Sequence, residues 1–298
     1  MTGRSFTRKE STKVNKLPGF SDRAVSVREV NLSGGLINDV VFLHGGTASD
    51  VCGAFPVVCA GATVCFVHAD ITSMVLSGTV EARSGSVLSG TFTGTMFGGL
   101  SVSSGCSAID NHVSDGGNLA VFEGGFVSNT VLPNFGHLSL HPGAFASDTK
   151  VKDGVITVWH GASASVVDVG CGGVANIERN AHVSDLIVDS GGTAYAGLET
   201  TCNYEYSKDD NILSFFYISS GGVLETMQPG TVVENGYVSN GGKMIVRNGC
   251  SANTINLKKG GELIVESGGK VTNLYGQGSA GLIKQEGAVV TFKNGKEN

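Results

Sequence analysis

The chain has 298 residues, of which 45 are glycine and only 5 are proline, and its formal net charge is −6. Glycine is about twice as frequent as its ordinary ~7%, but the every-third-residue period and the proline content of collagen are absent. A mean hydropathy of +0.12 is too apolar for an intrinsically disordered chain. No run approaches the roughly 18 to 20 apolar residues of a membrane-spanning helix, so we expect a folded chain without such a span.

Charge is unevenly distributed along the chain. Residues 1–28 hold seven Lys or Arg and two Asp or Glu, residues 29–257 hold seven and twenty, and residues 258–298 hold six and four. The net charges of these three segments are therefore +5, −13 and +2. The acidic body argues against a nucleic-acid partner, which would need clustered Lys and Arg. Residues 1–28 are predicted to be a flexible basic N-terminal segment, since short charged termini are commonly solvated.

A repeat of about 19 residues runs through the body of the chain. The segments VSNGGKMIVRNGCSANTIN (from Val238) and LKKGGELIVESGGKVTNLY (from Leu257) align without a gap. The same frame recurs upstream at nearly the same spacing, apart from one longer spacing that contains an insertion. The units begin at Thr95, Val113, Leu132, Val151, Val169, Val188, Ile218, Val238 and Leu257.

The repeat has the local chemistry of short strands joined by tight turns. Paired glycines allow positive φ where the backbone turns sharply, and the apolar residues between the turns alternate with a period of two. Glycine pairs every 8 to 11 residues would cost a helix roughly 1 kcal/mol per glycine. Strands this short bury an apolar face only if successive units stack as coils. The sequence therefore predicts an all-β parallel β-solenoid (β-helix) with coils of about 19 residues.

Three segments follow from this pattern. Residues 1–28 form the basic segment, residues 29–280 form the solenoid, and residues 281–298 form a C-terminal cap and tail. Caps matter because the terminal coils of a solenoid expose strand edges, which recruit other chains. Self-association through the solenoid ends is accordingly one expected kind of partnership.

Ser-Gly-Gly and Asp-Gly-Gly turns that recur within this repeat frame resemble the AIDA-type repeats of autotransporter adhesin passengers. The turns that carry the resemblance begin at Ser33, Asp115, Ser190, Ser220 and Ser267. The resemblance implies a right-handed β-helix on the bacterial surface that acts as an adhesin or stalk, with Ser and Thr residues that can be O-glycosylated with heptose. It covers residues 95–275 well and residues 30–94 loosely.

No catalytic, metal or cofactor site is predicted. The chain has no Gly-x-Ser-x-Gly, P-loop or His-Glu-x-x-His motif. The cluster Cys52, Cys59 and Cys65 lacks the short spacings of structural zinc sites, and we expect these thiols to pack in the core. Cys106 and Cys250 replace the second glycine of a turn, so we expect them to be partly exposed and the more reactive thiols. An odd total of seven cysteines without a Cys-x-x-Cys pair indicates reduced thiols.

Two features predict a ligand-binding surface. In three consecutive units the outward position after an inward Val or Leu holds Phe122, His141 and Trp159, which stacking would align in one column. Exposed aromatic rings bind sugar faces or other proteins. The alternative is that a loop or subunit covers them.

The insertion around residues 198–216 is the second feature. It mixes aromatic and acidic residues, of which Tyr204, Tyr206, Asp209 and Asp210 are candidate ligand contacts. Insertions in solenoids project as loops, often on the binding face. A plain surface loop or a lid over the solenoid side is an equally good interpretation.

The sequence thus favours a non-enzymatic adhesin or stalk-like protein whose partner is a cell-surface protein or glycan. One alternative is a tailspike-like or other oligomeric structural protein assembled in the cytoplasm. A second is a polysaccharide-active β-helix enzyme. The N-terminal residues contain no apolar signal segment, so we expect a surface or secreted location if a leader precedes this sequence and a cytoplasmic location otherwise.

Overall fold

The computed structural model describes residues 25–27, 30–36, 40–42, 45–54, 56–93, 98–198, 211–276 and 281–293. These residues form strands and turns, and none of them is helical. No helix able to span a membrane occurs in this part of the chain. The chain divides into two compact units, Met1–Ser139 with Gly143–Phe145, and Leu140–Pro142 with Ala146–Asn298.

The first unit is a succession of parallel strands, in which each coil pairs with the next. Its strands are β1 (Val25–Val27), β2 (Val30–Leu36), β3 (Val40–Phe42), β4 (Gly45–Ala54), β5 (Val57–Val58), β6 (Thr63–Val67), β7 (Asp70–Thr72), β8 (Val75–Leu76), β9 (Thr79–Arg83), β10 (Val87–Ser89), β11 (Phe92–Thr93), β12 (Gly99–Val102), β13 (Ser107–Val113), β14 (Asn118–Val121) and β15 (Phe126–Leu132).

The second unit has the same parallel pairing, with coils that each contain a short and a long strand. Residues of β16 (His137–Leu140) and β17 (Phe145–Lys152) belong to both units. The remaining strands are β18 (Val155–Val158), β19 (Ser163–Gly170), β20 (Val174–Glu178), β21 (His182–Val188), β22 (Thr193–Leu198), β23 (Asn211–Ile218), β24 (Val223–Thr226), β25 (Val232–Val238), β26 (Lys243–Val246), β27 (Ser251–Leu257), β28 (Glu262–Val265), β29 (Lys270–Gly276), β30 (Leu282–Lys284) and β31 (Val289–Phe292).

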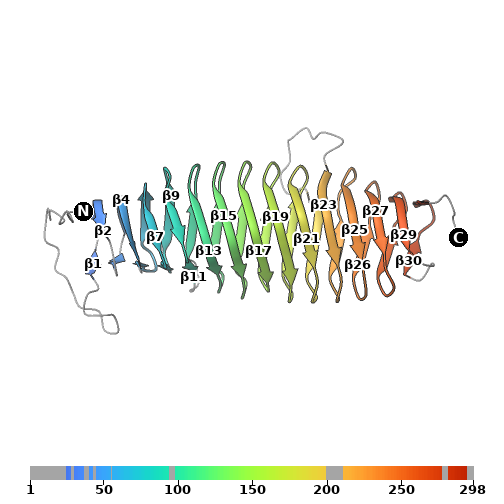
Figure 1. Cartoon of the computed structure of the whole chain (residues 1–298), viewed down its shortest axis with the longest axis horizontal. Helices are drawn as coiled ribbons and strands as arrows, with labels where there is room; N and C mark the ends of the chain where they lie inside the picture. Colours follow the sequence, from blue (N-terminus) through green and yellow to red (C-terminus); the bar gives the residue numbers. More distant parts are fainter. Residues whose placement is uncertain are drawn as a thin grey trace. The chain divides into compact units, whose positions relative to one another are not determined.

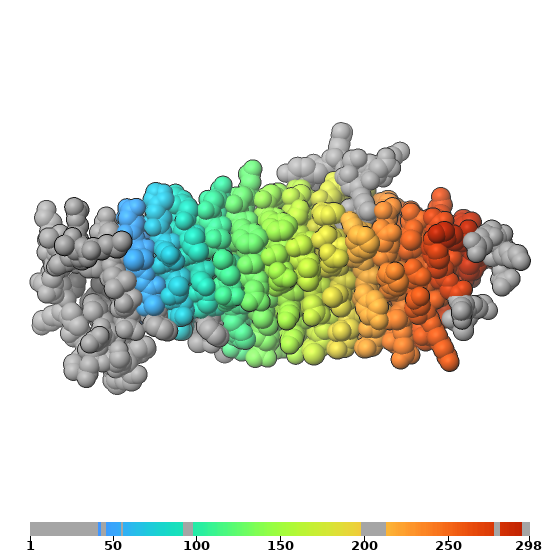
Figure 2. All heavy atoms as spheres, in the orientation of Figure 1, coloured from blue at the N-terminus to red at the C-terminus, as the bar shows by residue number. Residues whose placement is uncertain are grey.

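The prediction of an all-β parallel solenoid is confirmed, and so is the predicted coil length. Lys243 of β26 pairs with Glu262 of β28, and Ser251 of β27 pairs with Lys270 of β29, so each coil advances the register by one sequence repeat. Within the second unit the long strands β19 to β29 follow one another in chain order (Figure 1). In the space-filling view the coils of each unit appear as successive bands of colour (Figure 2).

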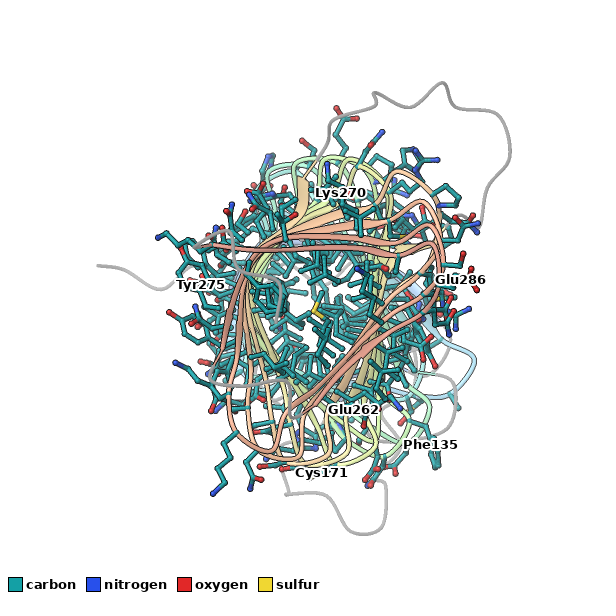
Figure 3. The ribbon with its side chains drawn as sticks, turned by 90° about the vertical axis from the view of Figure 1, so that its right-hand side faces the viewer. Phe135, Cys171, Glu262, Lys270, Tyr275 and Glu286 are labelled. Carbon is teal, nitrogen blue, oxygen red and sulfur yellow. The ribbon has the colours of Figure 1, made fainter. Side chains whose placement is uncertain are left out.

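The coils of each unit enclose apolar side chains. In β26 and β28 the alternate residues Met244, Val246, Leu263 and Val265 are fully buried, while their neighbours are partly exposed. Figure 3 looks along the direction in which the coils stack. Carbon-rich side chains fill the interior of the coils, whereas Lys270, Tyr275 and Glu262 project outward. The period-two pattern of the sequence therefore separates an inner face from an outer face of every strand.

In many of the long strands one residue has positive φ and forms a corner of the coil. In many coils this corner residue is Asn or Asp, which tolerate positive φ better than other side chains. The corner residues include Asp110, Asn129, Asp148, Asn235 and Asn273, with φ between 49° and 56°. Successive corners also contact one another, as where Asn129 Nδ2 donates to Asp110 Oδ1 over 2.6 Å.

At one such corner the residue is Val166, which is β-branched, rather than Asn or Asp. Its φ is 49° and its side chain is 38% exposed, so it carries the strain of left-handed backbone without compensating burial. Since that conformation costs an ordinary L-residue about 1 to 2 kcal/mol, Val166→Asn is expected to raise the free energy of unfolding by about 1 kcal/mol. Urea unfolding followed by circular dichroism measures this change.

Val87 provides the matched control for Val166. It is equally exposed, at 37%, but lies in the ordinary strand β10 and is not among the left-handed residues. Val87→Asn should therefore leave stability unchanged or lower it. An equal gain from both substitutions would contradict an effect of corner strain.

The described residues near the two chain ends also pair as strands. Val25 of β1 pairs with Val40 of β3, inside the segment 1–28 that the sequence assigns to a basic tail. Ile283 of β30 pairs with Ile264, and Val290 of β31 pairs with Val271, so residues assigned to the C-terminal cap continue the parallel stack.

Candidate functional site

Two of the three predicted column residues stack in the second unit. His141 and Trp159 each follow a short strand, and the Trp159 amide donates to the Leu140 carbonyl of the preceding coil over 3.0 Å. Their ring centroids lie 6.0 Å apart with an interplanar angle of 4°. Both side chains are partly exposed. Burial lowers the pKa of His141, which favours the neutral ring.

A buried carboxylate, which sequence reasoning missed, lies beside this His141–Trp159 stack. Val158 pairs with Ile177, so Glu178 occupies in the next coil the position that Trp159 occupies in its own. Glu178 is only 3% exposed, and its Oε2 accepts a hydrogen bond from the His160 amide over 3.2 Å. The sequence signal for the position of Glu178 was its spacing of one repeat from Trp159. The site thus combines stacked rings with an acidic group.

The other predicted site residues lie in the first unit or outside the described residues. Phe122 lies in the first unit, directly after β14, and is 40% exposed. Tyr204, Tyr206, Asp209 and Asp210 lie outside the described residues. Their predicted role in ligand binding remains a prediction.

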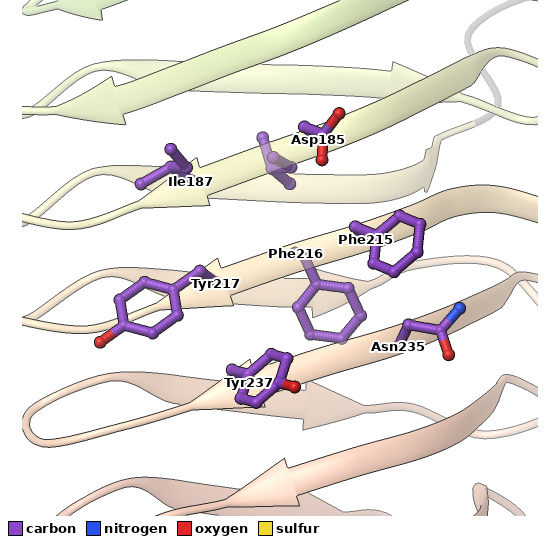
Figure 4. A pocket seen from close by; sticks show the side chains of 8 residues that line it. Asp185, Ile187, Phe215, Phe216, Tyr217, Asn235 and Tyr237 are labelled. Carbon is purple, nitrogen blue, oxygen red and sulfur yellow. The ribbon is translucent and has the colours of Figure 1, made fainter.

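A second aromatic surface lies on the outer side of β21, β23 and β25. It is an open groove of about 190 Å³, lined by Asp185, Leu186, Ile187, Phe215, Phe216, Tyr217, Asn235 and Tyr237. Phe215, Tyr217 and Tyr237 are 54%, 44% and 43% exposed. Figure 4 shows the two tyrosine rings at one side of the groove, and Phe215, Asp185 and Asn235 at the other.

Strand register aligns the groove's tyrosines with residues of further coils. Ile187 pairs with Tyr217, Tyr217 with Tyr237, Tyr237 with Asn256, and Asn256 with Tyr275. We call this row, which consists of Ile187, Tyr217, Tyr237, Asn256 and Tyr275, the tyrosine face. Ser239 Oγ donates to the Tyr217 hydroxyl over 2.8 Å, and Lys258 Nζ lies 6.0 Å from the Tyr237 ring centroid. The spacing of about one repeat from Tyr217 to Tyr237 was a signal of this alignment.

The predicted exposure of the cysteines was wrong. Cys106 and Cys250 are 2% and 1% exposed, because the residue at the second-glycine position of the turn points toward the preceding coil. Cys250 Sγ, for example, donates to the Gln228 carbonyl over 3.1 Å. Burial raises the pKa of Cys250, which makes its thiol less reactive rather than more.

The cysteines expected in the core lie on the outer side instead. Cys52 is exposed, and Cys59 and Cys65 are partly exposed. Val64 and Phe66 occupy the inward positions of β6, so the alternation turns Cys65 outward between them. Within the described residues, no group of three or more His, Cys, Asp or Glu side chains is placed to hold a metal ion.

The fold and its outward aromatic rings define a parallel β-solenoid repeat protein with exposed aromatic surfaces. Neither a family model nor a curated protein matches the sequence. The crystal structure of a TibC-catalyzed hyper-glycosylated TibA fragment superposes with a TM-score of 0.61 and 20% identity. The match covers 89% of this chain and 97% of that chain, and it shows a shared fold.

The pentapeptide repeat protein HetL from Nostoc sp. strain PCC 7120 was also found. It superposes with a TM-score of 0.19 and 12% identity, over 91% of this chain and 92% of its own. The agreement is too low to relate the two folds.

Proposed function

We propose that this chain is a non-enzymatic, adhesin-like or stalk-like repeat protein that presents a binding surface for a protein or carbohydrate on or outside a bacterial cell. The observation that carries the proposal is the partly exposed His141–Trp159 stack on the outer side of the coils. A close-paired strand stack holds such rings in fixed positions, so little conformational entropy is lost on binding.

The fold neighbour supports the adhesin interpretation. TibA is glycosylated in its crystal structure, and its fragment shares the solenoid fold over nearly its whole length. The AIDA-type turns of the sequence point to the same class of passenger. We therefore extend to this chain the expectations of a surface or secreted location and of glycosylated Ser or Thr residues, which intact mass spectrometry of the natively produced protein tests.

Trp159 gives a direct assay for the proposed binding surface, because it is the only tryptophan. We expect oligosaccharides or surface proteins that bind at the stack to change its fluorescence in a saturable manner. His141→Ala removes one of the two rings and should weaken binding about tenfold, since an aromatic pair contributes about 0.5 to 1.5 kcal/mol beyond its buried area.

Phe135→Ala is the matched control, because it removes an 80% exposed ring elsewhere. It should leave the affinity unchanged. Failure of a glycan array and of intact cells to bind the chain would contradict the proposed function. Binding that both His141→Ala and Trp159→Ala leave intact would place the ligand on another surface and contradict the role of the stack.

A further inference from the structure

We propose that the part of the groove between Phe215 and Tyr217 binds a quaternary ammonium group, of the trimethylammonium type that choline carries. Exposed aromatic rings, a carboxylate in the same groove and the lysines that cover the neighbouring tyrosines support this assignment. The site uses a different surface from the His141–Trp159 stack, so neither proposal depends on the other.

Two outward rings of β23 flank the centre of the groove. Phe215 and Tyr217 are 54% and 44% exposed, whereas Phe216 lines the groove between them and is only 3% exposed. The faces of aromatic rings carry partial negative charge and attract cations that lie within about 6 Å. A quaternary ammonium suits such rings because its methyl groups also pack on apolar surface, while a simple ammonium is strongly hydrated.

Carboxylates give this part of the groove a negative charge. Asp185 lines the groove and pairs with Phe215, so the two residues lie one coil, or about 4.8 Å, apart along the stack. Asp168 pairs with Ile187, which in turn pairs with Tyr217, so a second carboxylate lies in the same row two coils from Tyr217. Both acids are at least partly exposed. The charge of the groove therefore complements a cation at Phe215 and Tyr217.

Two other tyrosines of the tyrosine face already hold a cation of this chain. Lys258 Nζ lies 6.0 Å from the centroid of the Tyr237 ring. Lys293 Nζ lies 4.6 Å from the centroid of the Tyr275 ring. The outward rings of this face are therefore oriented so that a positive charge can lie on them.

A serine occupies the position from which a lysine would cover Tyr217. Lys258 comes two residues after Asn256, the register partner of Tyr237. The equivalent residue for Tyr217 is Ser239, which comes two residues after Tyr237. Ser239 brings no charge, and its Oγ donates to the Tyr217 hydroxyl over 2.8 Å. Within the part of the chain that the structure describes, the Tyr217 ring thus lies beside carboxylates without a lysine of its own.

Titration of the full chain with choline chloride, followed by ligand-observed NMR, tests the proposal. We expect saturable binding with a dissociation constant on the order of 1 mM, because cation–π contacts at exposed rings are individually weak. An uncharged analogue, in which carbon replaces the quaternary nitrogen, has the same shape and should bind about fivefold more weakly. Tyr217→Leu and Asp185→Asn should each weaken choline binding about threefold.

Ser239→Lys tests the position of the bound cation. It places a lysine where Lys258 lies relative to Tyr237, so its ammonium should compete for the Tyr217 ring and weaken choline binding about tenfold. Ser239→Ala is the matched control, because it removes the same hydroxyl without adding a charge, and it should bind choline about as the wild type does. Tyr275→Leu should also leave the affinity unchanged, since Lys293 already covers that ring.

Circular dichroism establishes that each variant is folded. Absence of saturable choline binding by the wild type would overturn the proposal, and so would equal binding of choline and its uncharged analogue, which would indicate a plain apolar groove. Choline binding that Ser239→Lys and Tyr217→Leu both leave intact would place the cation on another surface and overturn the assigned site. His141→Ala should not affect choline binding, so these outcomes are distinct from a failure of the function proposed for the His141–Trp159 stack.

Discussion

Gly222→Ala is expected to lower the free energy of unfolding by about 3 kcal/mol, the upper end of the usual cost of overpacking. A Cβ atom at Gly222 would lie 2.2 Å from the Val188 carbonyl oxygen and 2.5 Å from its carbonyl carbon. Both atoms belong to the backbone of the preceding coil, so no flexible side chain can move aside. The preceding residue, Gly221, has φ +87°, and the pair therefore supplies both the turn and the close approach between coils.

Urea unfolding followed by circular dichroism measures the effect of Gly222→Ala. Gly99→Ala is the control, because a Cβ there meets no atom within 4 Å. Since alanine also costs less conformational entropy than glycine in a strand, Gly99→Ala should be neutral or slightly stabilising. Equal losses at Gly99 and Gly222 would show that glycine is needed for some reason other than the approach of successive coils.

Phe66→Ala is expected to destabilise the first unit by about 3 to 5 kcal/mol, the usual cost of removing a buried Phe ring. The Phe66 side chain is fully buried, and its ring packs edge-on against Phe42 at a centroid distance of 6.2 Å and an angle of 90°. The close pairing of β4, β6 and β9 prevents the coils from collapsing into the space that the ring would leave. Denaturant unfolding measures the loss.

Phe135→Ala is the control for Phe66→Ala, because it removes the same kind of ring from an exposed position. Its ring is 80% exposed, so its removal should change stability by no more than about 0.5 kcal/mol. A small effect of Phe66→Ala, comparable to that of Phe135→Ala, would contradict a solid apolar core within the first unit.

Part of the candidate site could be predicted from spacing alone. His141 and Trp159 lie about one repeat apart, and each follows an inward residue, so the coil period brings them side by side. Glu178 follows the same rule, but buried acids are uncommon and a carboxylate near a turn suggests a solvated side chain. The insertion before β23 hid the alignment of Ile187 with Tyr217, because it lengthens their spacing well beyond one repeat.

The sequence by itself determined the coil period, the strand-and-turn chemistry and the inward positions, because these depend on local backbone preferences and on a burial pattern of period two. Only the tertiary structure decided which way each cysteine points and which distant residues share an outer face. Cys250 is buried because the preceding coil covers its turn. Asp185 and Lys258 flank one tyrosine face because strand register, which depends on contacts between coils, sets their positions across an insertion.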